Sequence, residues 1–362
     1  MKVFLESIGC RLNLSEIEKI SEKLRTAGHE IVGDSSEADI AVVNTCAVTN
    51  SASADSRKSV RRIAKSGCDH IHVTGCYATV DPEALLNLPS VEKIYNNNEK
   101  TLILDGLTNK NNTKFDAKPG RKPLPGKSHR TRAFIKVQDG CNNHCTFCLT
   151  RIARGKSISL PESEIFNDVK MALLGGAKEI VLTGVNLGSW GRDLGEKKSL
   201  PKLINKIIDR YAPKRIRLSS IEPWDVDESY FPVFEKHSFC KHLHLPLQSG
   251  SDVVLANMGR KITTIKYQKL VTKIRNSFPE MAITTDLIVG FPGESERDFR
   301  DGLDFVKEID FSGGHVFRYS PRVGTPAEKM ENAVLESEKR NRSRKMRSVI
   351  SESEISYQGK FI

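Results

Sequence analysis

Three cysteines within eight residues constrain this chain more than any other feature: Cys141, Cys145 and Cys148 form a C-x-x-x-C-x-x-C run. A loop this short cannot separate three thiolates, so they must converge on one centre, and soft sulfur ligands select zinc or an iron–sulfur cluster. A structural zinc site has four protein ligands, and no fourth cysteine follows nearby. A cubane cluster held this way would keep one iron open to a small molecule, whereas zinc would need His144 from the same tight loop as its fourth ligand.

The residues around this run resemble one branch of a known superfamily. The run is preceded by Phe134-Ile135-Lys136-Val137-Gln138 and followed by Arg154-Gly155. With these flanks it resembles the radical S-adenosylmethionine enzymes and, among them, the methylthiotransferases; the match departs at Arg151, where the family usually carries a proline. The resemblance implies a [4Fe–4S] cluster on the three cysteines. Its open iron would hold S-adenosylmethionine, which is cleaved to a 5′-deoxyadenosyl radical.

The first hundred residues alternate between strand and helix patterns. Short apolar runs at 2–8, 39–43 and 70–74 predict buried strands, and 91–95 adds a further candidate. Helical periodicity at 14–27 and 52–66 separates them. Such alternation predicts a small parallel sheet wrapped by helices, and we place this N-terminal domain at residues 1–104.

Three further cysteines, Cys10, Cys46 and Cys76, each follow one of these strands. Because the carboxyl ends of parallel strands lie along one edge of an open sheet, we expect the three thiols to converge there. Buried core cysteines would instead lie within strands. In the methylthiotransferases that this half of the chain resembles, three such cysteines bind a second, auxiliary [4Fe–4S] cluster. The resemblance therefore implies that its open iron holds the sulfur to be transferred.

A polar, basic linker is predicted at 105–130, where Pro119, Pro123 and Pro125 interrupt a lysine-rich stretch. After it, six strand candidates alternate with helical segments: 134–138, 179–183, 215–219, 242–247, 282–289 and 315–319. Six βα units are too few for a closed eight-stranded barrel and fit a partial (βα)6 barrel at 131–348, with its chemistry at the carboxyl ends of the strands. The fold class is thus α/β. We expect residues 349–362 to be a stub that leads into a C-terminal RNA-binding domain of the TRAM type, whose entry strand the run at 358–362 resembles.

The loops that follow the barrel strands are rich in glycine and polar residues. Glycine permits close backbone approach to a ligand, and Ser, Glu or Gln can bond ribose hydroxyls or an amino group. Matching positions line the S-adenosylmethionine pocket of the family, which makes Glu222 and Gln248 the leading cofactor contacts. The full predicted set is Gly184, Asn186, Ser219, Glu222, Gln248 and Gly290. The sequence does not assign catalytic residues beyond these ligands.

Composition favours a soluble cytoplasmic protein with a polyanionic partner. No run of about 18 apolar residues is present, so no membrane span is expected, and eight cysteines in tight groupings suit reduced metal ligands better than disulfides. The net charge is +11. Basic residues gather at 110–136 and at 339–347, where either a solvated surface or RNA phosphate contacts would account for them.

Finer resemblance bears on the substrate. The run Asn44-Thr45-Cys46-Ala47-Val48-Thr49-Asn50 and the helix carrying Arg57, Arg61 and Arg62 resemble the branch that acts on N6-threonylcarbamoyladenosine at position 37, beside the tRNA anticodon. That implies methylthiolation at C2, with the tRNA anticodon stem-loop as partner and a flavodoxin or ferredoxin as electron donor. The alternatives are isopentenyladenosine in tRNA, an aspartate of a ribosomal protein, or a non-enzymatic RNA-binding protein stabilised by zinc.

Overall fold

The computed structural model describes residues 1–107, 120–121, 124–125, 131–195 and 199–360. These form two compact units. The first contains Met1–Cys141, Leu149–Val185 and Asn205–Ile216, and the second contains Asn142–Cys148, Asn186–Ile204 and Arg217–Ile362. Segments 149–185 and 205–216, which the sequence assigns to the barrel, therefore pack within the first unit.

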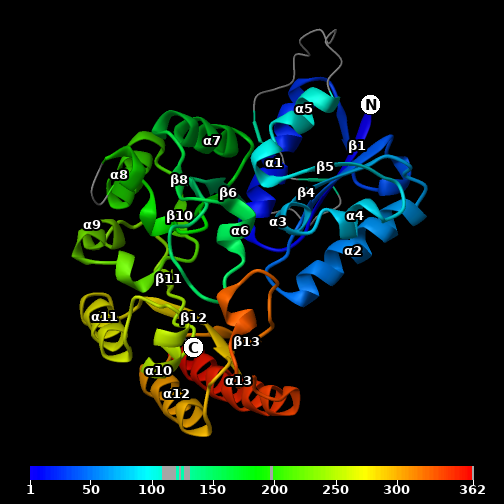
Figure 1. The fold of residues 1–362 in the computed structure, drawn as a ribbon. Helices are drawn as coiled ribbons and strands as arrows, with labels where there is room; N and C mark the ends of the chain where they lie inside the picture. The colour runs from blue at the N-terminus through cyan, green and yellow to red at the C-terminus, as the bar shows by residue number, and fades with distance from the viewer. Residues whose placement is uncertain (108–119, 122–123, 126–130, 196–198, 361–362) are drawn as a thin grey trace. The chain divides into compact units, whose positions relative to one another are not determined.

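A five-stranded parallel sheet forms the centre of the N-terminal region (Figure 1, blue to cyan). Its order is β2-β1-β3-β4-β5. Four of the strands match the predicted apolar runs, whereas β2 has only three residues, too few to show a period. The strands are β1 Lys2–Ser7, β2 Glu30–Val32, β3 Ile40–Thr45, β4 Ile71–Gly75 and β5 Val91–Tyr95.

The two faces of this sheet bury different helices because successive side chains of a strand point to opposite sides. Val3 of β1 packs with Ile17 of α1 (Arg11–Thr26). Phe4, the next residue of β1, packs with Val60 of α2 (Asn50–Lys65) on the other face. The shorter elements of this region are η1 Ser35–Glu37, α3 Cys76–Val80, α4 Glu83–Leu86, η2 Asn97–Glu99 and α5 Leu102–Leu107.

The six strands predicted after the linker are present. They pair in two three-stranded sheets ordered β10-β9-β6 and β11-β12-β13, and an isolated parallel bridge joins Ser220 to His244. The pairings β6–β9, β11–β12 and β12–β13 are parallel. The strands are β6 Arg132–Lys136, β9 Glu179–Thr183, β10 Arg215–Leu218, β11 His242–His244, β12 Ala282–Val289 and β13 Gly314–Arg318, with a short antiparallel pair β7 Gln138–Asp139 and β8 Ile158–Ser159.

Helices and short turns alternate with these strands, as a βα series requires (Figure 1, green to red). They are α6 Thr150–Arg154, α7 Glu162–Leu174, η3 Leu187–Ser189, η4 Arg192–Leu194, α8 Ser199–Tyr211, η5 Pro223–Asp225, η6 Glu228–Tyr230, α9 Phe231–Phe234, α10 Asp252–Asn257, α11 Thr264–Ser277, α12 Glu296–Ile309, η7 Pro326–Lys329 and α13 Glu336–Gly359. No helix within the described ranges is both long and apolar enough to cross a membrane.

Within the predicted C-terminal stub, Gln358 and Gly359 are helical rather than extended, and residues 361–362 lie outside the described residues. Residues 349–359 continue helix α13, which buries Met346, Val349, Ile350 and Ser353. Their spacing of three, four and seven residues places them on one helical face. That apolar face, rather than strand alternation, decides the local structure.

The two basic runs, for which a solvated surface or RNA phosphate contacts were the expectations, are in part buried and paired. Arg121 is buried, donates to the backbone oxygen of Ser15 at 2.6 Å and pairs with Glu18 at 3.1 Å. Arg342 on α13 is buried and pairs with Glu294 at 2.7 Å. Lys110, Lys114, Lys118, Lys122, Lys127 and Arg130 lie outside the described residues.

A close backbone approach in the second unit provides a test of this packing. A Cβ atom added at Gly250 would lie 2.7 Å from the backbone oxygen of Gly302 in α12, whereas one added at Gly302 would approach nothing nearer than 3.6 Å. Gly250→Ala should therefore lower the free energy of unfolding by about 1–3 kcal/mol through overpacking. Gly302→Ala should raise it by about 0.5–1 kcal/mol, because alanine favours a helix interior. Chemical denaturation of the two variants checks this, and equal effects would contradict the close approach of Gly250 to the backbone of α12.

Candidate metal centres

The run Cys141–Cys148 lies in a loop that is held at both ends. In the first unit, the N–H of Cys141 donates to the oxygen of Gly155 at 3.1 Å. In the second unit, the N–H of Cys148 donates to the oxygen of Cys145 at 3.2 Å, closing a tight turn. Thr146 between them donates its N–H to the oxygen of Met258 at 3.0 Å. Each part of the loop is therefore held by backbone bonds within its own unit, and the boundary between the units falls between Cys141 and Asn142.

Arg260 lies beside this loop and is a residue that the sequence analysis missed. Its Nη1 is 3.7 Å from the sulfur of Cys145. The same guanidinium forms a two-pronged pair with Glu222, at 3.1 and 2.7 Å, and lies 4.5 Å from the ring centre of Trp224. Burial raises the pKa of Cys145 to about 11, while Arg260 opposes the rise. No local pattern marks Arg260, because its partners come from distant parts of the chain.

The predicted cofactor contacts have varied surroundings. Ser219 has a buried hydroxyl with no hydrogen-bond partner among the described residues, which suits a ligand contact. The carboxylate of Glu222 is already paired with Arg260. A Cβ atom at Gly184 would lie 2.9 Å from the side chain of Gln138, in the first unit. Asn186, in the second unit, is buried.

Gln248 and Gly290 serve the backbone of the second unit. Gln248 has φ +78°, donates its N–H to the oxygen of Asp286 at 2.9 Å and accepts from the N–H of Ile288 at 2.8 Å. A Cβ atom at Gly290 would lie 2.3 Å from Lys339 Cγ. Both residues thus have a structural role, and a cofactor contact for either stays a prediction.

Cys10, Cys46 and Cys76 lie at the carboxyl ends of β1, β3 and β4. The order β2-β1-β3-β4-β5 reverses direction between β1 and β3, so Cys10 and Cys46 flank the switch point where open α/β sheets bind ligands. Gly9 allows the close approach, because a Cβ atom there would lie 2.5 Å from the sulfur of Cys46. The sheet topology therefore brings together three cysteines that are far apart in the sequence.

The three thiols share one electrostatic environment. Burial raises the pKa of Cys46 to about 11, and the nearby Cys10 and Cys76 add to the rise. Burial likewise raises the pKa of Cys10, with Arg154 opposing and Cys76 adding. Because the thiol pKa values are raised, these side chains would ionise only beside a centre that supplies positive charge, as a metal cluster does.

Polar groups lie beside two of the three sulfur atoms. The sulfur of Cys76 accepts from Arg154 Nε at 3.3 Å and from Asn97 Nδ2 at 3.7 Å. The sulfur of Cys10 is 3.7 Å from Asn13 Oδ1. Asn13 Nδ2 also donates to the oxygens of Ile8 and Thr45, at 2.9 and 3.0 Å, and so joins the ends of β1 and β3.

A buried group of charges lies behind these cysteines. Arg154 pairs with Glu16 at 2.9 Å and with Asp139 at 3.0 Å, and Lys100 and Lys136 also pair with Glu16. Burial alone would raise the pKa of Glu16, but these three cations hold it well below its usual range. Burial would lower the pKa of Arg154, but Glu16, Cys76 and Asp139 raise it instead. Glu16 and Arg154 are therefore charged.

The sulfur ligands of the two triads are of the kind that iron–sulfur clusters use, and their assignment as cluster ligands stays a prediction. In the described part of the chain, no three His, Cys, Asp or Glu side chains are arranged to hold one metal ion. His144, the fourth ligand that zinc would need, is exposed. A cluster spreads its ligands over several irons, and N–H groups directed at the sulfur atoms stabilise thiolates. All eight cysteines are free thiols.

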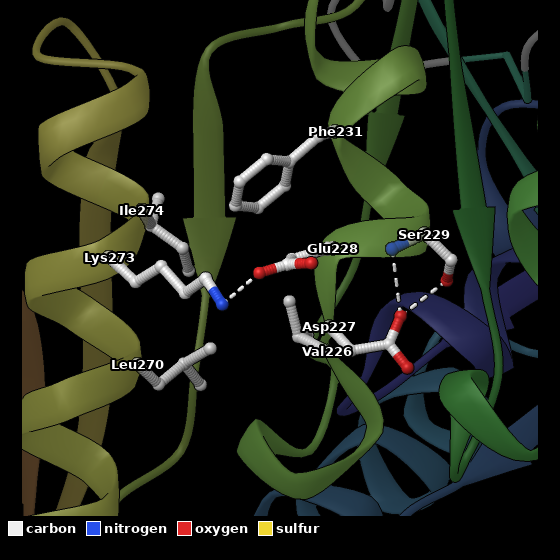
Figure 2. A pocket seen from close by; sticks show the side chains of 8 residues that line it. All are labelled: Val226, Asp227, Glu228, Ser229, Phe231, Leu270, Lys273 and Ile274. Atoms are coloured by element: carbon white, nitrogen blue, oxygen red, sulfur yellow. Dashed lines mark hydrogen bonds and ion pairs between the residues drawn. The ribbon is translucent and has the colours of Figure 1, made fainter.

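Two cavities of the second unit differ in their relation to the predicted cofactor contacts. Figure 2 shows one of about 380 Å³, where Lys273 pairs with Glu228. None of the six predicted contacts lines it. Gln248 borders a cavity of only about 10 Å³, room for a water molecule at most.

The buried charge group generates a pH-dependent prediction. Glu16→Gln should destabilise the apoprotein by about 3 kcal/mol at pH 7, because Lys100 would remain buried without its carboxylate. The folded-state pKa of Glu16 lies below its unfolded value, so its contribution is present above the unfolded value and is lost as the pH falls through the folded value. The difference between parent and variant should therefore shrink in acid. Urea unfolding over a pH series measures it, and a difference that does not vary with pH would contradict the assignment.

Two family models match the chain. One, described as Uncharacterized protein family UPF0004, matches residues 2–95, and the other, the Radical SAM superfamily, matches residues 135–306. Among solved structures, the radical S-adenosylmethionine methyltransferase TsrM from Kitasatospora setae aligns over 90% of this chain and 74% of that chain, with a TM-score of 0.65 and 15% identity. A likeness at this identity establishes the fold alone.

Curated relatives match over nearly the whole chain. The Threonylcarbamoyladenosine tRNA methylthiotransferase MtaB of Thermotoga maritima is 40% identical, over 99% of this chain and 84% of the relative. The protein of the same name from Bacillus subtilis is 36% identical, over 94% and 78%. A tRNA-2-methylthio-N(6)-dimethylallyladenosine synthase from Clostridium tetani is 33% identical, over 97% and 81%. The chain therefore belongs to the radical S-adenosylmethionine methylthiotransferase family.

Proposed function

We propose that this enzyme adds a methylthio group to C2 of N6-threonylcarbamoyladenosine at position 37 of tRNA. The observation that carries the proposal is the presence of two separate cysteine triads, each placed by a βα framework, in a chain of this family. A C–H bond on an adenine ring offers no acidic proton, so acid–base catalysis alone cannot replace it. The cofactors, two [4Fe–4S] clusters and S-adenosylmethionine, supply the radical chemistry.

The residues divide between the two centres. Cys141, Cys145 and Cys148 would hold the cluster that serves S-adenosylmethionine. Cys10, Cys46 and Cys76 would hold the second cluster, at the switch point of the five-stranded sheet. Three protein ligands leave one iron of each cluster for a non-protein ligand.

Within the second unit, Arg260 and Ser219 fit the S-adenosylmethionine side of this arrangement. Arg260 keeps a buried positive charge beside Cys145 and holds Glu222 in a fixed orientation. The unpartnered hydroxyl of Ser219 offers one hydrogen bond to a bound molecule. Asn186, Gln248 and Gly290 of the second unit are further proposed contacts, and Gly184 is a proposed contact from the first unit.

We choose between the two candidate modified adenosines by the identity of this chain to relatives named for each. The proteins named for threonylcarbamoyladenosine are 40% and 36% identical, against 33% for the synthase named for dimethylallyladenosine. Dimethylallyladenosine in tRNA is therefore the alternative substrate. A reductant of the flavodoxin or ferredoxin type would supply electrons, and a tRNA substrate places the reaction in the cytoplasm.

Helix α2 offers a surface for tRNA phosphates. Lys58, Arg61, Arg62 and Lys65 are exposed and lie three, four and seven residues apart, on one face of the helix. Arg62 also pairs with Glu6 at 3.1 Å. Arg57 is instead engaged with the hydroxyl and ring of Tyr77, the residue after Cys76. An exposed basic face of this kind suits a polyanion.

Replacing each cysteine triad should separate the two activities. Changing Cys141, Cys145 and Cys148 to Ala should leave about half of the roughly eight iron atoms per chain and abolish cleavage of S-adenosylmethionine. Changing Cys10, Cys46 and Cys76 to Ala should also leave about half the iron and retain cleavage, but should abolish methylthio transfer. Iron analysis, quantification of 5′-deoxyadenosine and mass spectrometry of tRNA nucleosides measure the three quantities.

Each triad variant is the control for the other. Cleavage that survives loss of the 141–148 triad would reject the central assignment. Unchanged methylthiolation without the other triad would make Cys10, Cys46 and Cys76 structural. If the methylthio group is found on dimethylallyladenosine instead, the proposed substrate is wrong and the proposed reaction class is retained.

Removing charge from α2 should weaken tRNA binding. Lys58→Gln, Arg61→Gln and Lys65→Gln together should lower affinity and reduce the slope of log K against log salt by up to about three, because each phosphate that is no longer neutralised lowers the slope by roughly one. Binding titrations over a salt series measure both quantities.

A second triple variant controls for net charge. Lys266→Gln, Lys269→Gln and Arg300→Gln also remove two lysines and one arginine, all three exposed, from helices α11 and α12. These changes should leave the slope at the parent value. Equal slopes in both triple variants would show that α2 is only solvated.

A further inference from the structure

Arg154 bonds several residues around the second cysteine triad, although it is not itself a predicted cluster ligand. Its Nε donates to the sulfur of Cys76 at 3.3 Å. Its Nη2 donates to Asn13 Oδ1 at 2.7 Å, and its Nη1 pairs with Glu16 and Asp139. One guanidinium therefore reaches a predicted cluster ligand, the amide that joins the ends of β1 and β3, and two carboxylates.

The surrounding charges do not cancel. Arg154, Lys100 and Lys136 bring three positive charges, and Glu16 and Asp139 bring two negative ones. One positive charge therefore remains in a buried group that touches Cys76 through Arg154. In a low-dielectric interior such a charge acts strongly on a nearby anionic centre.

The hydrogen bonding is directed at one sulfur. Cys76 accepts from side-chain donors of both Arg154 and Asn97, and Asn97 is itself held by donating to the oxygen of Ala153, the residue before Arg154. Cys10 is linked to Arg154 only through Asn13. Helix α6 therefore carries both a donor to Cys76 and the backbone oxygen that orients the second donor.

We propose that Arg154 is a positioning residue of the second cluster, which holds the ligand loops of Cys10 and Cys76 in register and raises the reduction potential of the cluster through its hydrogen bond to the Cys76 sulfur. The proposal rests on the assignment of Cys10, Cys46 and Cys76 as cluster ligands. Hydrogen bonds to ligand sulfurs and nearby positive charge both favour the reduced, more negative cluster. Arg154 supplies both in one side chain.

The test isolates this cluster. In a background with Cys141, Cys145 and Cys148 changed to Ala, anaerobically reconstituted protein carries only the second cluster, and its midpoint potential is followed by electron paramagnetic resonance during a redox titration. Arg154→Gln should shift the potential to a more negative value, because it removes one positive charge and the guanidinium donor. Lys100 and Lys136 would still balance Glu16 and Asp139, so the variant should fold. Glu16→Gln should shift the potential in the opposite direction.

Arg121→Gln is the matched control. Arg121 and Arg154 are equally buried, each 6% exposed, but Arg121 bonds Ser15 and Glu18 rather than a cysteine. Its replacement should lower stability and leave the potential at the parent value. Equal potential and equal iron content in Arg154→Gln and the background would overturn the proposal.

Loss of iron from Arg154→Gln is also informative. If that variant stays folded but loses its cluster while Arg121→Gln keeps it, the positioning role is supported, and Arg154→Lys is used for the potential. A lysine retains the charge but cannot reach all four partners, so its potential should also be more negative; an unchanged value there would overturn the proposed effect on the potential. A background protein that binds no iron at all would instead reject the ligand assignment itself.

Discussion

The buried pair of Arg154 and Glu16 is the interaction on which the proposed N-terminal metal centre depends. Charges are tolerated in a protein interior only where opposite charges lie beside them, and here Lys100, Lys136 and Asp139 extend the pair into a group. The pair also joins distant segments: Glu16 lies in α1, and Arg154 ends α6, 138 residues later. The predicted ligand Cys76 bonds the same guanidinium. Ordering of the ligand loops is therefore tied to ordering of the charge group.

The order of the strands in the sheet brings Cys10, Cys46 and Cys76 to the same edge. A 2-1-3-4-5 order puts the ends of β1 and β3 side by side at the switch point, with β4 next along the sheet. Loops at that edge need few residues to bring their side chains together. Gly9 lets the first loop approach Cys46 closely. Three cysteines thus reach one place without any long or specialised ligand loop.

For the basic residues, a prediction of exposure from residue type alone is wrong at several positions. Lys and Arg in a run predict a solvated or nucleic-acid-binding surface. In the fold, Arg121, Arg342 and Lys136 pair with Glu18, Glu294 and Glu16. Their partners are distant in sequence, so no local pattern announces them. By contrast, the exposed residues of α2 share one helical face, a regularity that the sequence does contain.

The sequence by itself determined the strand and helix alternation, the two cysteine triads and the family, because apolar periodicity and close cysteine spacing are local properties. Only the tertiary structure decided that 349–359 is helical, that Arg260 lies beside Cys145, and that Arg154 bonds Cys76. These three depend on which distant side chains share a buried environment. Burial and charge pairing are properties of the packed chain, and a linear pattern does not encode which partners will meet.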